Sequence, residues 1–102
     1  MITYHFAKEF TRYPGGRLRK DGPWSGQQFR EDVLLKLLAE HDVVRVDLSG
    51  ARGFGSSFLD EAFGEAAKRL GVKKVKESLE LTCDDDPMLL ELISQKIEKA
   101  TQ

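Results

Sequence analysis

Two adjacent serines, Ser56 and Ser57, are the residues of this chain best suited to chemistry. They follow a glycine-rich stretch, residues 50–55, and precede the apolar pattern of a helix. The first turn of a helix exposes unpaired backbone N–H groups, which stabilise an anion. A phosphate there adds about −1.5 to −2 charges, which the helix tolerates and a partner surface does not. The serines therefore indicate a contact or switch surface, although Ser57 followed by Asp60 is also typical of a simple helix N-cap.

Other residue types of a nucleophilic triad occur as His5, His41 and Asp47, but their spacing fixes no common geometry. The sequence GFGSSF is not a G-x-S-x-G elbow. The glycines of residues 50–55 are ordered GxxGxG rather than GxGxxG, so turns that need positive φ explain them better than nucleotide binding. The two histidines lack partners at metal-ligand spacing. We therefore expect no enzymatic activity, no cofactor and no metal site.

A basic segment near the amino end carries aromatic residues, Tyr13 and Trp24, among its charges. Its five cations are Arg12, Arg17, Arg19, Lys20 and Arg30. Arginines interleaved with aromatics suit contact with nucleic acid, and they equally suit a protein interface. Because the net charge of the chain is −1, no overall field attracts nucleic acid. We favour a protein contact, and keep a nucleic-acid-binding accessory module as the alternative.

The amino-terminal part of the chain predicts a hairpin. Residues 2–7 alternate between apolar and polar types, which is the period of a half-buried strand. Turn signals at residues 14–16 and 21–23 enclose the short polar stretch 17–20, which we interpret as an edge strand. This hairpin would supply the antiparallel part of a sheet.

The first helix has a clear beginning. Ser25 is a good N-cap, and Gln28 completes a capping box with it. Trp24 and Phe29 have the spacing of a hydrophobic staple. The apolar stripe of this helix runs through Phe29, Val33, Leu34, Leu37 and Leu38.

The remaining elements alternate between strand and helix. Residues 43–48 form a nearly continuous apolar run, typical of a strand covered on both faces. A helix follows from residue 59 and ends at Gly71, a strand covers residues 79–83, and Asp86 with Pro87 opens a last helix. The predicted order is β-β-α-β-α-β-α. This order indicates a small α/β fold with a mixed sheet of about four strands and helices packed against it.

Length and composition fit one domain spanning residues 1–102. The single cysteine, Cys83, cannot pair within the chain, which suits a reducing cytoplasm and a buried structural thiol. No apolar run approaches the roughly 20 residues of a membrane span, and the amino end lacks the pattern of a signal peptide. We therefore expect a cytoplasmic protein without a membrane partner.

The stretch VVRVDLSGARGFGSSFLDEAFG, residues 43–64, resembles the strand–loop–helix signature of STAS domains (sulphate transporter and anti-sigma-factor antagonist). More closely, the chain resembles the STAS-like domain-of-unknown-function family of bacteria. Three pieces carry this resemblance: a basic turn at residues 12–19, SGQQFR at residues 25–30, and SSFLDEAFG at residues 56–64. The resemblance covers most of the chain, roughly from Phe10 to Gly64. The resemblance implies a STAS-like fold and a bacterial regulatory module that binds another protein.

In anti-sigma-factor antagonists, the first serine of the matching pattern is phosphorylated by a partner with a histidine-kinase-type ATPase fold, and phosphorylation blocks binding to that partner. By position Ser56 matches this serine, while Gly55 replaces the pattern's aspartate and Phe58 its glycine. The resemblance therefore implies such an ATPase as the protein partner. The contact residues that it implies are Gly53, Gly55, Ser56, Ser57, Phe58, Asp60 and Glu61.

Overall fold

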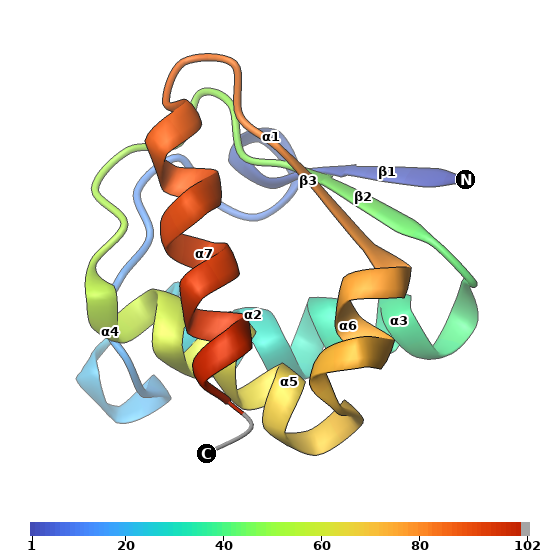
Figure 1. Ribbon diagram of the computed structural model, residues 1–102. Helices are drawn as coiled ribbons and strands as arrows, with labels where there is room; N and C mark the ends of the chain where they lie inside the picture. Colours follow the sequence, from blue (N-terminus) through green and yellow to red (C-terminus); the bar gives the residue numbers. More distant parts are fainter. Residues whose placement is uncertain (101–102) are drawn as a thin grey trace.

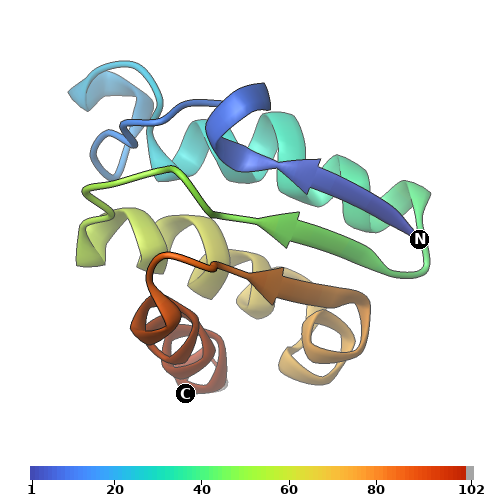
Figure 2. The ribbon, with the colours of Figure 1, turned by 90° about the horizontal axis from the view of Figure 1, so that it is seen from above.

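The computed structural model describes residues 1–100, in which three parallel strands form the sheet. The strands are β1 (Ile2–His5), β2 (Val44–Asp47) and β3 (Leu79–Thr82), in the spatial order β1-β2-β3. Figure 2 shows them side by side with their arrows pointing the same way. In this register His5, Asp47 and Thr82 lie in one row where the three strands end.

Helices connect the strands and follow the last one (Figure 1). The helical elements are α1 (Phe6–Glu9), η1 (Arg19–Asp21), α2 (Gly26–Phe29), η2 (Arg30–Leu34), α3 (Leu35–Glu40), α4 (Ser56–Leu59), η3 (Asp60–Gly64), α5 (Glu65–Leu70), α6 (Val72–Ser78) and α7 (Pro87–Lys99). The elements α2, η2 and α3 form one continuous helical run, and α4, η3 and α5 form a second. Both runs contain a π-helical stretch in the middle, η2 and η3.

The helices cover one face of the sheet and leave the other face open (Figures 1 and 2). Val44 and Val46 are fully buried, whereas Arg45 and Asp47, which point the other way, are half-buried. Arg45 pairs with Glu80 across the outer face at 3.0 Å. β2 is the central strand, as predicted, but the prediction that it is covered on both faces is wrong, because alternate residues of β2 are charged.

The predicted amino-terminal hairpin is also wrong. Residues 17–20 form no strand; they run into the short 3₁₀ helix η1 and lie along the beginning of α2. The backbone N–H of Gly26 donates to Gly16 at 2.9 Å, and that of Gln27 to Arg17 at 3.0 Å. The sheet of residues 1–100 thus has three strands and no antiparallel part, while the α/β class is confirmed.

Several predicted helix ends are confirmed. The Ser25 hydroxyl accepts a hydrogen bond from the Gln28 N–H at 3.0 Å, and Gln28 Oε1 accepts from the Trp24 N–H at 2.9 Å, one residue before the cap. Trp24 packs on Phe10 rather than directly on Phe29, and Phe10 contacts Phe29 with ring centres 5.3 Å apart. Gly71 ends α5 with a φ of 95°, where glycine is favoured.

Pro87 begins α7 directly after Asp86, as predicted. The helix α6 was not expected from the sequence, because its stretch VKKVKES carries few apolar residues. None of the helices within residues 1–100 combines the length and apolar character needed to cross a membrane.

Candidate functional site

The two serines lie at an exposed corner, where the loop that follows β2 turns into α4 (Figure 1). Ser56 and Ser57 are both exposed, as are Gly53 and Gly55 before them. Gly53 has a φ of 85°, and a Cβ added at either glycine would meet no atom within 4 Å. The corner, which we define as residues 53–57, therefore projects into solvent with its two hydroxyl groups accessible.

The serines do not cap the helix. Gly55 is the N-cap residue, and the Leu59 N–H donates to its carbonyl at 3.2 Å. No side chain caps this end, so the prediction that Ser57 is an N-cap is wrong by two positions. The Ser56 hydroxyl instead accepts a hydrogen bond from Lys96 Nζ of α7 at 2.7 Å.

The corner rests on aromatic side chains that belong to the core. Phe58 is fully buried, with its ring centre 5.6 Å from Phe54 and 6.0 Å from Phe6. Phe58 was predicted as a partner contact, but its side chain is not accessible. Its role is to anchor the first turn of α4 and thus to hold the serines in place.

Asp60, one turn after the serines, lies between two cations. Its carboxylate is 3.1 Å from Lys96 Nζ and 3.7 Å from Arg17 Nη2. These residues border a shallow pocket of about 250 Å³ that also includes Lys68 and Lys99. The exposed side of the corner is therefore a mixed-charge surface that joins the amino-terminal loop, the second helical run and α7.

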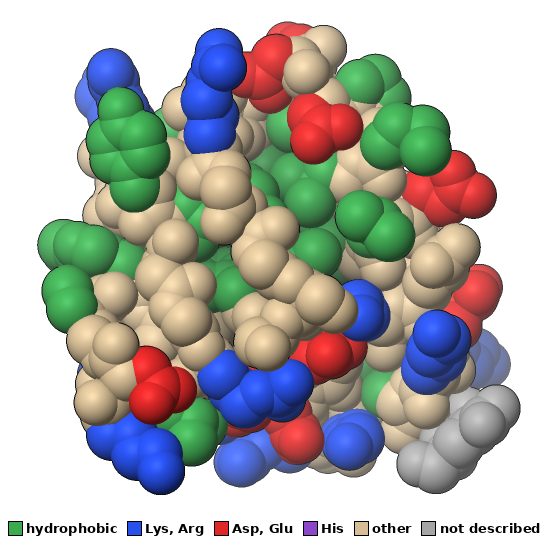
Figure 3. Space-filling view, turned by 90° about the vertical axis from the view of Figure 1, so that its left-hand side faces the viewer, with side chains coloured by type: hydrophobic (Ala, Val, Ile, Leu, Met, Phe, Trp, Pro, Cys, Tyr) green, Lys and Arg blue, Asp and Glu red, His purple; other side chains and the backbone are tan. Residues whose placement is uncertain are grey.

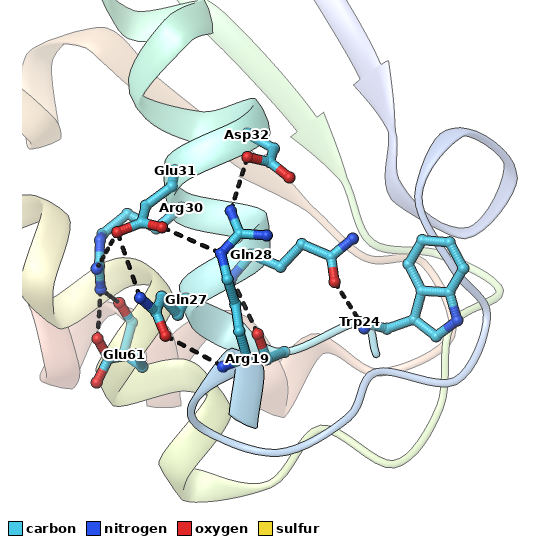
Figure 4. A network of polar contacts seen from close by, with 9 residues as sticks. Arg19, Trp24, Gln27, Gln28, Arg30, Glu31, Asp32 and Glu61 are labelled. Atoms are coloured by element: carbon cyan, nitrogen blue, oxygen red, sulfur yellow. Dashed lines mark hydrogen bonds and ion pairs between the residues drawn. The ribbon is translucent and has the colours of Figure 1, made fainter. Parts of the chain in front are cut away.

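Glu61 points the other way, into a buried ion pair with Arg30 (Figure 4). The Arg30 side chain is only 2% exposed, and its Nη1 donates to the Glu61 carbonyl at 2.6 Å and to Glu61 Oε2 at 2.5 Å. Both residues were predicted to lie on interaction surfaces. In the structure this ion pair holds the two helical runs together. Because the Arg30 side chain is buried, it is not accessible to a partner.

The basic segment is largely neutralised by carboxylates of the same chain. Arg17 lies 3.6 Å from Glu61. Arg19 pairs with Glu31 at 3.2 Å and with Asp32 at 2.7 Å (Figure 4). The hydrogen bond from Arg19 lowers the pKa of Glu31. Lys20 and Arg12 are exposed. Since three of the five predicted cations pair with carboxylates, these contacts do not favour a continuous phosphate-binding surface.

Two residues that contact the corner or the loop before it were missed by sequence reasoning. Lys96 lies forty positions from Ser56, so no local pattern could indicate their contact. Asp85 fastens the loop before the corner, since its Oδ2 accepts from the Gly50 N–H at 3.0 Å. This bond lowers the pKa of Asp85. In the sequence Asp85 stands out only as the middle of three successive aspartates, residues 84–86, a pattern that does not by itself indicate contact with this loop.

The His5 and Asp47 side chains are brought together at 3.6 Å on the outer face of the sheet. Asp47 accepts a hydrogen bond from the Ser49 N–H at 3.0 Å, and its pKa is lowered by hydrogen bonds from Ser49, then from Thr82, and by the nearby His5. The Ser56 hydroxyl contacts Lys96 Nζ of α7 rather than this histidine–aspartate pair. Within residues 1–100, no three histidine, cysteine or acidic side chains are grouped where they could share a metal ion.

Comparison with known protein families identifies a match. The family model of the STAS-like domain of unknown function (DUF4325) matches residues 25–88. These residues include the capped start of α2, the sheet strands β2 and β3, and the corner. Searches of curated proteins and of solved structures found no match. Because the family model covers more than half of the sequence, the chain belongs to the family of STAS-like domains of unknown function.

Proposed function

We propose that this domain is a non-catalytic regulatory module that docks a protein partner through the corner at residues 53–57. Membership in a STAS-like family suggests a regulatory role. The observation that carries the proposal is the exposure of two hydroxyl groups on a corner whose base, Phe58, is fixed in the core. A rigid, accessible surface loses little conformational entropy when a partner binds.

The partner class that the family resemblance supports is a histidine-kinase-type ATPase, and Ser56 is the residue that it would phosphorylate. Lys96 Nζ lies 2.7 Å from the Ser56 hydroxyl, so a phosphate there would meet a cation of its own chain. Asp60 shares that cation at 3.1 Å. A phosphate would therefore compete with Asp60 for Lys96, leave the fold intact and change the charge that the partner meets.

A pulldown with quantitative mass spectrometry tests this proposal. Baits are the natural protein, Ser56→Asp, Ser56→Ala and, as a matched control, Ser94→Asp, which adds the same charge at another exposed serine on α7. We expect the natural protein, Ser56→Ala and Ser94→Asp to recover a common partner, and Ser56→Asp to lose it. Equal recovery by Ser56→Asp would show that the corner does not control binding.

A further inference from the structure

A second hollow lies beside the corner, between the loop that follows β2 and the beginning of α7. It encloses about 430 Å³, within the range of about 300–1,000 Å³ that is usual for binding sites. The loop contributes Ala51, Arg52, Gly53 and Phe54 to it. The loop and α7 therefore form its two sides, and Gly53 belongs to both this hollow and the corner.

The floor of the hollow is apolar. Ala51 and Leu89 are buried, and Phe54 is half-buried against the ring of Phe6, 5.1 Å away. Leu92 of α7 also lines the hollow and is 47% exposed, and Met88, which precedes it on the same helix, is 68% exposed. They are four residues apart and so share one face of the helix. Neither side chain is buried in the core of the domain, so this face of α7 has exposed apolar area available for a contact.

The edges of the hollow differ in charge. Figure 3 shows a group of hydrophobic side chains on this face of the molecule, with acidic side chains and a basic one next to it. Asp85 and Asp86 line the α7 side of the hollow, and Arg52 lines its loop side. Asp84 and Glu91, which neighbour the α7 side in the sequence, are also exposed. An occupant with apolar side chains followed by lysines or arginines would match this arrangement, because the acidic edge carries more charge than the basic one.

The two sides of the hollow are fastened to one another. Asp85 accepts hydrogen bonds from the Gly50 N–H at 3.0 Å and from Cys83 Sγ at 3.3 Å. The Asp84 N–H donates to Ser49 Oγ at 2.8 Å. The hollow is therefore formed before any partner arrives, which lowers the entropic cost of binding.

We propose that this hollow receives a short amphipathic helix of the partner protein, with bulky apolar side chains on the floor and lysines or arginines against the acidic edge. The inference rests on the proposed function, to which it adds the chemistry of the partner. A second copy of this chain fits less well. Its basic helix α6 buries Val75 and half-buries Val72 in its own fold, so neither is free to enter the hollow.

Peptide binding followed by NMR amide shifts tests the inference without the natural partner. The probe is a synthetic helical peptide of about 15 residues with leucines on one face and lysines on the other. One control peptide has glutamates in place of the lysines, and another has serines in place of the leucines. We expect saturable shifts around Ala51, Phe54 and Leu89 with the leucine–lysine peptide, and at least about tenfold weaker binding of both controls.

Two protein variants complete the test. Leu92→Ser should weaken the leucine–lysine peptide by about tenfold or more, whereas Leu70→Ser, at an exposed leucine at the end of α5, should not. Several outcomes would overturn the inference: absence of saturable shifts, equal binding of the glutamate peptide, equal loss in Leu70→Ser, or self-association that Leu92→Ser abolishes. If the peptide fails while Ser56→Asp still loses its partner, the docking corner stands and the hollow does not.

Discussion

Arg30 and Glu61 join the two helical runs at the point where both leave α-helical geometry. Arg30 is the first residue of η2, and Glu61 lies in η3. The Glu65 N–H donates to the Asp60 carbonyl, five residues back, which releases the Glu61 carbonyl from the α-helical pattern. Arg30 Nη1 donates to that carbonyl at 2.6 Å, so the guanidinium satisfies an acceptor that the π-helical stretch leaves open.

Replacement of Arg30 by methionine should destabilise the fold strongly. It leaves the carboxylate and carbonyl of Glu61 without their buried donor, and breaking a buried ion pair typically costs about 3–5 kcal/mol. Arg19→Met is the matched control, because Arg19 pairs with carboxylates at the surface, where such pairs contribute about 0–1 kcal/mol. Urea denaturation measures both. Similar losses in the two variants would contradict the structural role of Arg30.

Gly26→Ala should disturb the crossing of the two helical runs. A Cβ at Gly26 would lie 2.6 Å from the Phe58 carbonyl oxygen, so the backbones would have to separate, at a cost of about 1–3 kcal/mol. Gly64→Ala is the control within the second run. Its Cβ would make an ordinary contact at 3.6 Å with the Lys96 carbonyl, and alanine favours a helix by about 0.5–1 kcal/mol. Thermal unfolding should show opposite signs for the two substitutions.

Ser25→Ala and Ser57→Ala distinguish a capping serine from an exposed one. Ser25 accepts the Gln28 N–H, and its loss should cost about 0.5–2 kcal/mol. Ser57 caps nothing, so its replacement should change the free energy of unfolding by less than about 0.5 kcal/mol. If Ser57→Ala lowers the free energy of unfolding as much as Ser25→Ala does, Ser57 caps the helix after all, which would contradict the structure.

Acid should destabilise the domain partly through Asp47. Hydrogen bonds from Ser49 lower its folded-state pKa below the ordinary value of 3.8, so the folded protein binds fewer protons than the unfolded one in that range. The stability that this group contributes is present above the unfolded pKa and is lost as the pH falls through the folded pKa. As the pH is lowered from the unfolded-state pKa of Asp47 through its folded-state pKa, the melting temperature should fall less steeply for Asp47→Asn and for Ser49→Ala than for the natural protein. An unchanged slope in both variants would contradict this assignment.

Cys83 should react slowly with alkylating reagents. Burial, and then the neighbouring Asp85, raise the pKa of its thiol to about 11, so almost no thiolate exists at neutral pH. Iodoacetamide labelling followed by mass spectrometry should show a slow reaction in the native protein and a fast one in denaturant. Equal rates in the two conditions would mean that the carboxyl end of β3 opens readily.

Local patterns in the sequence predict the elements whose signals are regular. The Ser25 cap, the stop at Gly71 and the Asp86–Pro87 start are confirmed, because each depends on backbone groups within a few residues. The stretch 17–20 shows where this reasoning fails. The turn signals on both sides of it predict a short edge strand, but Arg17 and Arg19 pair with carboxylates on the helical runs, and the chain follows those helices instead.

The site was predictable only in part, for a similar reason. The exposed corner follows from a glycine-rich turn before a helix, and the sequence indicates it. Which of its side chains face solvent depends on contacts between distant segments, such as Phe58 with Phe6 and Ser56 with Lys96. Arg30 was assigned to a surface because arginine is rarely buried, and only its pairing with Glu61 across thirty-one positions explains its place in the core.

Site-specific photo-crosslinking tests the central claim most directly. A photoreactive phenylalanine derivative placed at Ser57 would report on whatever contacts the corner in the source cells, and the same residue at Ser94 serves as the reference. The account predicts a discrete protein adduct from position 57 that is absent from position 94. No adduct at position 57, or the same adducts from both positions, would contradict a docking surface at residues 53–57.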